Sequence, residues 1–579
     1  MPDSRAQVHD RVVPKLCGAD IELGNLIIGD SAVVAIDAAG EAARALLAEI
    51  SGFRRSAARS YYAPSHAESA WPPQIGGTYE PPFMEGPDRA YLGRESGYHE
   101  LAQDRGRKFL TCGGCAYIDL DHLEICLPEV TSAMDHVAAF GAMLRIAREA
   151  MVRANGRMPG GRTIKVLVNN SNGHGSSYGS HLNFLVTREC WNNIFNRRMH
   201  YLLFLASYQC ASIVLTGAGK VGAENSREPA RFQIAARGDF FEVLTGPQTT
   251  YCRPICNSRD EACVGKRDDR LARLHSIFFD NTLCHTSGLL KVGMTQIILA
   301  MIEQEQVPSH LLLEDPVNAL QRWSRDPELK AKSRLIDGAE CTAVELLEAI
   351  FECATRFVDA GRANGLVSDV DGIMELWGVC LQKLRQRDFD YLAGRIDWVA
   401  KLSLLERTAA KRGLGWESAS MKYLDHMYSS LDPAEGLYWA LERANAVQKL
   451  VSDAQIERFV HEPPDDTRAW LRAYILRHAE AVVVDDVDWD MVRLREERLC
   501  PTAWASYDYP ALWMADPLGF TRRDCEQVLR AAPSLIDGLR ALGLGRGSGF
   551  GSVRGSTSTQ IVQRDQPAPA LPGELLTGD

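Results

Sequence analysis

The sequence lacks an excess of basic residues and any long hydrophobic run. Its 579 residues contain 64 Lys and Arg against 75 Asp and Glu, which gives a net charge of −11. Nucleic-acid-binding surfaces are usually basic, so this balance argues against one over most of the chain, although it leaves room for a local basic groove. No run approaches the roughly 18 apolar residues of a membrane span, and the amino-terminal stretch MPDSRAQVHDRVVPKLCG is too polar for a secretory signal. These absences predict a cytoplasmic protein without nucleic-acid or membrane partners.

The chain also lacks the two best-known phosphate-binding loops. The stretch NNSNGHGSSYGSHLNF, residues 169–184, is rich in glycine but contains neither the G-K-[ST] of a P-loop nor the G-x-G-x-x-G of a dinucleotide fold. Its glycines would let backbone N–H groups approach an anion, with His174 and His181 as ligands or phosphate contacts. Taken alone, the loop is better explained as a glycine-rich connection between two strands.

Cysteine is present, with fifteen residues, but no pattern indicates a disulfide framework. In a cytoplasmic protein these residues are expected to be thiols, most of them small buried hydrophobic side chains. Cys112 and Cys115 form a lone C-x-x-C, and a structural zinc would need a second pair of ligands at a suitable spacing. We therefore interpret this pair as incidental to a glycine-bearing turn before a strand.

The hydrophobic pattern divides the chain into two parts. Up to about residue 300, short apolar runs alternate with Gly, Asn and Ser clusters, and segments such as 163–170 and 182–186 are typical of strands. From about 290 to 480, apolar residues recur three and four positions apart, which predicts helices. The expected fold class is α+β.

Changes in composition predict the domain limits. A large catalytic domain is expected over residues 1–483, followed by a small carboxy-terminal domain over 484–543. Residues 544–579 have the composition of a disordered tail. Residues 54–107 are rich in Pro, Gly, Tyr and charge, and a loop of this length upstream of an acidic cluster predicts an active-site loop.

The acidic cluster lies in CGGCAYIDLDHLEICLPE, residues 112–129. Buried carboxylates are costly unless they are paired, hydrogen-bonded or bound to a metal. In a strand, Asp119 and Asp121 project from one face, and Glu124 joins them only if the chain turns near His122. Four acidic residues interrupt this otherwise apolar segment: Asp119, Asp121, Glu124 and Glu129.

A second acidic pair lies near the amino terminus, in CGADIELGN. Asp20 and Glu22 share one face of the expected strand, and Ile21 and Leu23 share the other. Two strands that present paired carboxylates to one face can bind Mg²⁺, which takes oxygen ligands and often accompanies nucleotide phosphate. An antiparallel sheet with one wet face gives the same alternation, and the pattern alone favours that simpler explanation.

Three arginines occupy strand-like contexts in ARGDFFEV and TTYCRPICNSRDEA. An arginine in an apolar strand needs a partner, usually phosphate or carboxylate. Structural ion pairs with Asp239, Glu242 or Asp260 would satisfy them equally well. The arginines concerned are Arg237, Arg253 and Arg259.

These segments, in this order, resemble the Dop/PafA family, which comprises the deamidase and depupylase of the ubiquitin-like protein Pup and the Pup ligase. Matching stretches include GADIELG, AYIDLDHLEICLPEVT, NNSNGHGSSYGSHLNFLVTR and FQIAARGDFFEVLTGPQTTYCRPICNSRDE, and together the matches span residues 18 to about 490. EPPDDTRA and DWVAKL look more like the depupylase branch. The resemblance implies a curved, mostly antiparallel sheet backed by helices, as in glutamine synthetase, with a small carboxy-terminal domain.

The resemblance also implies a function. It points to an ATP- and Mg²⁺-dependent amidohydrolase that acts on the carboxy-terminal glutamine or the isopeptide bond of Pup or a Pup-like modifier. The alternatives are a Pup–protein ligase and a catalytically weakened ATP-binding regulator. The implied catalytic residue is Asp119, and the implied metal ligands are Asp20, Glu22 and Glu124. The implied cofactor-binding residues are Tyr117, His181 and the three arginines described above, Arg237, Arg253 and Arg259.

Four positions depart from the family pattern. Asp20 replaces a glutamate, and Leu123 stands where the family has proline. Leu182 and Cys263 replace a glutamate and a histidine. The remaining site residues are kept, so we expect a divergent member with an intact nucleotide site.

Overall fold

The structure of the protein is a computed structural model. It describes residues 12–29, 38–54, 106–260, 270–480, 482–495 and 509–545. The predicted active-site loop and disordered tail lie almost wholly outside the described residues, as does Cys263.

The centre of the molecule is an antiparallel sheet built around one long strand, β1 (Cys17–Ile28). One half of β1 pairs with β5 and β7, and the other half pairs with β6. This arrangement confirms the predicted fold class. The strands in sheet order are β12 (Leu271–Ser276), β7 (Ser180–Thr187), β1, β5 (His122–Cys126), β4 (Cys115–Asp119), β3 (Lys108–Phe109) and β2 (Phe53–Arg54), with β6 (Thr163–Leu167) beside β1.

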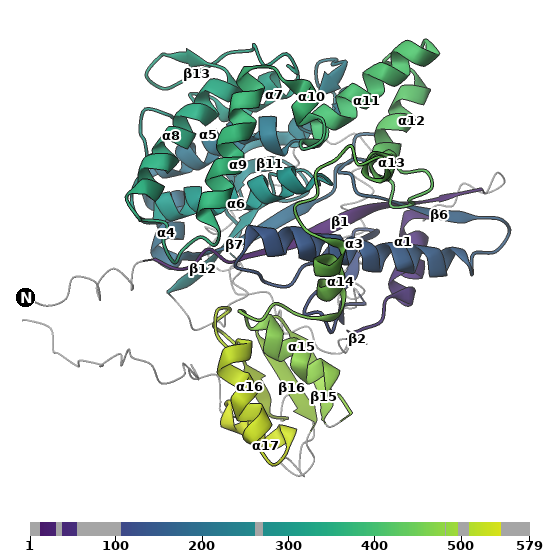
Figure 1. Ribbon diagram of the computed structural model, residues 1–579, viewed down its shortest axis with the longest axis vertical. Helices are drawn as coiled ribbons and strands as arrows, with labels where there is room; N and C mark the ends of the chain where they lie inside the picture. The colour runs from purple at the N-terminus through teal and green to yellow at the C-terminus, as the bar shows by residue number, and fades with distance from the viewer. Residues whose placement is uncertain are drawn as a thin grey trace, which may run out of the picture.

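The alternation of side chains along β1 gives the sheet an apolar and a polar face. Ile21 and Leu23 are almost completely buried on the first face, which α3 and α1 cover (Figure 1). Apolar burial on this face stabilises the fold by roughly 25 cal/mol per Å² of surface removed from water. The opposite face carries Asp20 and Glu22. The helices on the apolar face are α1 (Ala38–Glu49), α3 (Ala133–Asn155) and, behind α3, α6 (His285–Glu303).

The predicted division into a strand half and a helix half is wrong in its first part, because α3 and α5 (Met199–Thr216) also lie there. Fifteen of the eighteen residues of α5 are buried, so its sequence shows no amphipathic stripe that would identify a helix. Within the described chain, α5 alone is long and apolar enough to cross a membrane, contrary to our reading of the hydrophobic runs. Because 83% of it is buried inside the protein, α5 is a core helix.

The helical pattern after residue 290 is confirmed, and the three helices that follow α6 pack against α5 or α6 (Figure 1). A capping box between Thr342 and Glu345 fixes the start of α8. The helices are α7 (Pro316–Ser324), α8 (Ala343–Asp359), α9 (Val370–Arg385), α10 (Phe389–Leu392), α11 (Asp397–Arg412), α12 (Ala419–Tyr428), α13 (Leu437–Arg443), α14 (Asp453–His461) and α15 (Ala469–Arg477).

Short strands and helices connect the main sheet to the helices that surround it. A parallel pair, β10 and β11, lies beside α5, and the small hairpins β8–β9 and β13–β14 lie outside the main sheet. Their bounds are α4 (Arg188–Asn192), η2 (Asn193–Arg197), β8 (Lys220–Val221), β9 (Phe232–Gln233), η3 (Gly238–Phe240), β10 (Phe241–Gly246), β11 (Arg253–Asn257), β13 (Ser333–Arg334) and β14 (Glu340–Cys341).

The carboxy-terminal part forms a three-stranded sheet with two helices, at the bottom of Figure 1. Its elements are β15 (Val483–Asp488), β16 (Met491–Arg495), β17 (Ala511–Trp513), α16 (Arg522–Ala531) and α17 (Leu535–Ala541). The apolar core of this part continues through α15 onto Phe109 and Tyr117 of the main sheet. The predicted boundary at residue 484 therefore stays a prediction.

Candidate functional site

A tight turn between β4 and β5 creates the acidic cluster. Leu120 and Asp121 both have positive φ, 42° and 69°, as in the two-residue turns that suit the twist of a hairpin. The turn places Tyr117 opposite Glu124. Directly paired residues of antiparallel strands share a face, so Glu124 lies on the same side as Asp119. The structure thus contains the chain turn near His122 that Glu124 needs in order to share a face with Asp119.

The neighbouring strand adds a third carboxylate. Glu22 of β1 lies directly opposite Glu124 of β5. One oxygen from each of Glu22, Asp119 and Glu124 falls within 4.8 Å of the others. Glu22 and Glu124 are buried, at 7% and 3% exposure. The structure thus brings together the predicted catalytic residue and two of the three predicted metal ligands.

Crowding of these acids changes their protonation. Burial, with the charge of Asp119, raises the pKa of Glu22 to about 7. Burial and the charges of Asp119 and Glu22 raise the pKa of Glu124 well above its usual range. A hydrogen bond from Tyr117 opposes this effect, and Glu124 Oε2 has no hydrogen-bond partner. Positive charge relieves the repulsion in such a cluster, and a divalent cation with oxygen ligands would supply it.

The third predicted metal ligand, Asp20, belongs to two further groups, one with Glu124 and Cys126 and one with two histidines. Asp20 lies opposite His181 of β7 and accepts a hydrogen bond from Asn183 at 2.8 Å. Asp20, His181 and His275 of β12 offer ligand atoms within 4.8 Å of one another. The sequence analysis missed His275, although strand alternation in RLHS places it on the face of Arg273.

Both histidines are suited to bind a cation. Burial, together with the charges of nearby arginines, lowers the pKa of His181 and of His275 well below the usual value. Neutral imidazole is the form that binds metal ions. His275 Nδ1 is buried without a hydrogen-bond partner. The polar face therefore carries an all-oxygen group and, next to it, a mixed nitrogen and oxygen group.

Gly179 leaves the space that these two groups share. A Cβ atom at this position would lie 2.5 Å from His181 Nε2 and 2.8 Å from Glu22 Oε1. Real Cβ atoms do not approach other atoms so closely. A methyl group here would therefore force the His181 and Glu22 side chains to move, whereas the backbone conformation itself does not need glycine, since its φ is not in the left-handed region.

Two of the predicted arginines lie beside the acids. Arg237 is 1% exposed, and the charges of Arg237 and Arg253 act on Glu22, whose pKa they lower. Both arginines contact Ser177, because Arg237 Nε donates to its hydroxyl at 3.3 Å and Arg253 donates to its carbonyl at 2.8 Å. Arg237 does not lie in a strand as predicted. It directly precedes η3, and Asp280 accepts its backbone N–H at 3.1 Å.

The other predicted basic residues lie further out. Arg259 follows β11, and its charge reaches His181 and His275. His174 is exposed in the glycine loop and belongs to none of the candidate metal groups in the described part of the chain. The proposed ion-pair partners have other roles, since Asp239 pairs with Lys220 and Arg325, and Asp260 pairs with Arg188.

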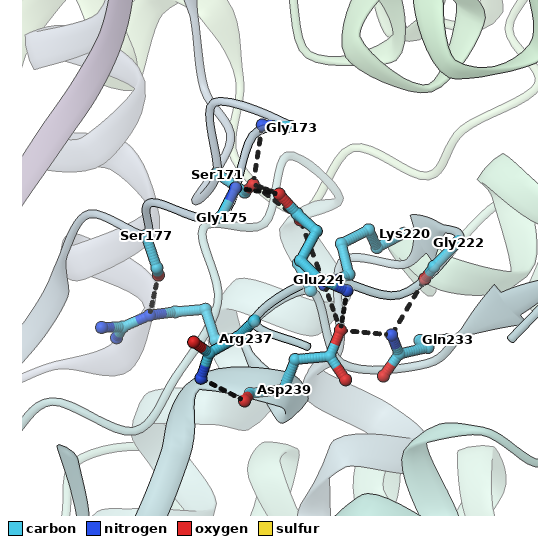
Figure 2. A network of polar contacts seen from close by, with 12 residues as sticks. Ser171, Gly173, Gly175, Ser177, Lys220, Gly222, Glu224, Gln233, Arg237 and Asp239 are labelled. Carbon is cyan, nitrogen blue, oxygen red and sulfur yellow. Dashed lines mark hydrogen bonds and ion pairs between the residues drawn. The ribbon is translucent and has the colours of Figure 1, made fainter. Parts of the chain in front are cut away.

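A buried network fixes the glycine loop (Figure 2). The Glu224 carboxylate accepts hydrogen bonds from Ser171 Oγ at 2.7 Å and from the backbone N–H of Gly175 at 3.2 Å. Lys220 links Glu224 to Asp239 at 3.2 and 2.7 Å.

The glycine loop therefore does not serve as an anion cradle. Gly175 N–H binds Glu224, and the N–H groups of His174 and Ser176 bind Asn172 Oδ1. These donors are satisfied within the protein. The loop instead positions Ser177, which both arginines contact.

Two acids of the acidic cluster in residues 112–129 lie outside the site. Glu129 binds Arg468 at 2.9 Å and Arg472 at 2.7 Å, and these arginines lower its pKa to about 2. It therefore fastens α15 to the end of β5. Asp121 lies in the hairpin turn.

The C-x-x-C pair also lies outside the site. Cys112 and Cys115 are buried free thiols. In the described part of the chain, neither belongs to a group of three possible metal ligands.

Comparison with known proteins identifies the family of this chain. A model of the Pup-ligase protein family matches residues 37–493. The chain belongs to this family. Among curated relatives, the depupylase of Acidothermus cellulolyticus is 35% identical over 66% of this chain and 74% of its own length. The Pup deamidase/depupylase of Mycolicibacterium smegmatis shows the same identity and coverage.

Ligases of the family are equally similar. The Pup–protein ligase of Acidimicrobium ferrooxidans is 35% identical over 67% of this chain and 84% of its own length. The structure of a Pup ligase with ADP is similar at 25% identity and a TM-score of 0.63, covering 80% of this chain and 98% of the ligase. A ligase in complex with Pup shares the fold, at 22% identity and a TM-score of 0.69 over 89% of this chain and 91% of the ligase. The resemblance to the Dop/PafA family is confirmed, and sequence identity does not separate its two branches.

Proposed function

We propose that this protein is an ATP- and Mg²⁺-dependent deamidase and depupylase that acts on the carboxy-terminal glutamine or the isopeptide bond of Pup or a Pup-like modifier. The observation that carries the proposal is the group formed by Glu22, Asp119 and Glu124 beside two arginines. Family membership supports it, since relatives named depupylase are 35% identical.

The site fits the two cofactors. Mg²⁺ prefers carboxylate oxygens, and Glu22 and Glu124 would hold it, with the unpartnered Glu124 Oε2 as a free ligand atom. Arginine recognises phosphate through paired N–H groups, so Arg237 and Arg253 would hold the nucleotide phosphates. The similarity to a Pup ligase with ADP supports ATP as the nucleotide. Asp20 and His181, with His275, provide a further place for a cation.

The remaining residues explain how the amide could be cleaved. Asp119 is half-buried at the end of β4, and we propose that its carboxylate attacks the side-chain amide of the modifier, or helps water to attack it. Ammonia or the lysine of a conjugated protein would then leave, and where Asp119 itself had attacked, water would hydrolyse the resulting anhydride and restore the Asp119 carboxylate. When bound, Mg²⁺ neutralises phosphate charge next to Asp119. Tyr117 holds Glu124 in place through its hydrogen bond.

A ligase is the second candidate. Its support is the identity of 35% to a Pup–protein ligase, equal to that of the depupylases. In a ligase, ATP would phosphorylate the carboxy-terminal glutamate of the modifier, and Asp119 would accept a proton from the incoming lysine. Both reactions need the same residues, so the site alone does not choose between them.

Mass spectrometry of a carboxy-terminal Pup peptide in its glutamine form tests the proposal. With the protein, Mg²⁺ and ATP, we expect conversion of the amide to the acid, and we expect Asp119→Asn to abolish it. Asp121→Asn is the matched control, because this residue lies two positions away in the turn. If the peptide stays an amide while its glutamate form becomes joined to lysine-bearing protein, the protein is a ligase. If neither reaction occurs although ATP binds, it is a regulator.

We also propose a cytoplasmic location. All thirteen cysteines in the described part of the chain are free thiols, a state that suits a reducing compartment. Treating the purified protein with a thiol-specific label, with and without reductant, tests this; labelling that increases after reduction would contradict it.

A further inference from the structure

A cavity of about 270 Å³ lies behind the main sheet, on the face opposite the carboxylates. Ile21 lines it, and Ile21 alternates with Glu22 along β1, so the sheet separates the cavity from the proposed nucleotide site. The other walls come from α3, α6, α13 and the start of α14. Nothing in the proposed reaction uses this cavity.

A buried ammonium group lies in the cavity wall. Lys291 of α6 is 4% exposed, and it donates hydrogen bonds to the Asp280 carbonyl at 2.8 Å and to Thr282 Oγ1 at 3.3 Å. Burial lowers its pKa to about 8, which leaves it charged at neutral pH. An ammonium group has three N–H donors, so the two bonds to the protein leave one for a ligand.

A second donor lies nearly two turns earlier, at the start of α6. His285 Nδ1 accepts the backbone N–H groups of Leu450 at 3.1 Å and Val451 at 3.4 Å. Burial lowers the pKa of His285 to about 4, so the ring is neutral at pH 7. A neutral imidazole whose Nδ1 accepts must carry its proton on Nε2. His285 therefore carries an N–H donor on Nε2, and the residue lines the cavity.

The remaining lining combines aromatic surface with charged side chains, of which Arg145 and Lys449 are already in ion pairs with acids. Phe140, Tyr438 and Trp439 provide the aromatic surface, and Arg148 lies 4.2 Å from the centre of the Trp439 ring. Four lining side chains are cationic and two are acidic. These are Arg145, Arg148, Lys291 and Lys449 against Glu442 and Asp453.

We propose that this cavity binds a small organic carboxylate with an aromatic or aliphatic body. The carboxylate would accept hydrogen bonds from Lys291 and His285, and the body would pack against the aromatic side chains. The volume lies below the roughly 300–1,000 Å³ of pockets for drug-sized molecules, which limits the ligand to a smaller compound. The site stands independently of the function proposed for the opposite face.

Calorimetric titration with 3-phenylpropanoate tests the proposal, with 3-phenylpropanamide as the uncharged match. We expect saturable binding of one carboxylate per chain, and at least tenfold weaker binding of the amide. Lys291→Met should weaken carboxylate binding at least tenfold. Saturating Mg²⁺ and ATP should not displace the carboxylate, because the sheet lies between the two sites.

A second variant tests the cavity without removing a charge. Gly288 lines the cavity, and a Cβ there would make only an ordinary 3.5 Å contact with Val137. Gly288→Leu should fill the cavity and abolish binding, whereas Gly415→Leu, at a position with open space around it, should bind like the wild type. Equal binding of acid and amide, unchanged binding by Gly288→Leu, or no saturable binding of the carboxylate would each overturn the proposal.

Discussion

Glu22 and Glu124 lie directly opposite each other on β1 and β5, both buried on the same face of the sheet. Like charges in direct cross-strand pairs destabilise a sheet. The pair is therefore an unfavourable arrangement for the empty protein, and a cation between its oxygens would relieve the repulsion. Two of the predictions below follow from this relationship.

Mg²⁺ affinity should rise with pH. A carboxylate must lose its proton to bind the ion, and the pKa of Glu22 is about 7. The ionised fraction of Glu22, and with it the affinity, should increase about tenfold from about pH 6 to about pH 8. Calorimetric titration with Mg²⁺ across this range measures it. Glu22→Gln should bind weakly at every pH, and a flat profile for the wild type would contradict the prediction.

The metal-free protein should lose stability as the pH rises. The pKa of Glu22 is about 7 in the folded protein, above its ordinary value of 4.5, so between these values the folded state binds more protons than the unfolded state and stability falls with increasing pH. Thermal melting in chelator should show this fall. Glu124→Gln should raise the melting temperature at pH 8 and remove the protection that Mg²⁺ gives. A lower melting temperature for Glu124→Gln would contradict the repulsion argument.

Gly179→Ala should damage the site directly. The added methyl would lie within 2.8 Å of both His181 and Glu22, so one of these side chains must move. We expect Mg²⁺ affinity to fall at least tenfold, as measured by calorimetry. Gly175→Ala is a control for substitution in the same loop, although its positive φ of 95° predicts some loss of stability without a steric clash. Normal Mg²⁺ binding by Gly179→Ala would show that the space beside Gly179 is not needed for Mg²⁺ binding.

Glu224→Gln should loosen the glycine loop. The carboxylate that accepts from Ser171 and Gly175 also faces Lys220, and an amide cannot replace this charge. Through Ser177, the change should shift Arg237 and Arg253 and weaken nucleotide binding about tenfold, that is by about 1.4 kcal/mol. Fluorescent-nucleotide titration measures this loss. Exposed Glu228→Gln is the control, and equal affinities for the two variants would contradict the role of the network.

Glu129→Ala should lower stability without affecting the site. Removing one partner of a buried ion pair costs about 3–5 kcal/mol, and Arg468 and Arg472 would both lose their acidic partner. Because the pKa of Glu129 is about 2, its stabilising effect should be present above pH 4.5 and decline as the pH falls toward 2. Urea unfolding measures the loss, and nucleotide affinity should stay within twofold of the wild type. A large fall in affinity would place Glu129 in the site after all.

The sequence by itself determined the central part of the site. Alternation along β1 placed Asp20 and Glu22 on one face, and the same reasoning placed Asp119 with Glu124 once the chain turned between them. Such patterns are readable because side chains of a strand alternate with a period of two. The ordered series of matching segments also identified the family, which the family model confirms.

Only the tertiary structure decided which acids are functional candidates and which are structural. Glu129 looked like its neighbours, but its partners Arg468 and Arg472 lie more than 300 positions along the chain. His275 joins Asp20 only because β7 places β12 near β1. Likewise, Glu224 occupies the loop donors that had suggested an anion site. These contacts depend on how distant segments pack, which local periodicity does not encode. The same packing buries α5 on nearly every side, so its sequence lacks the amphipathic pattern that would identify a helix.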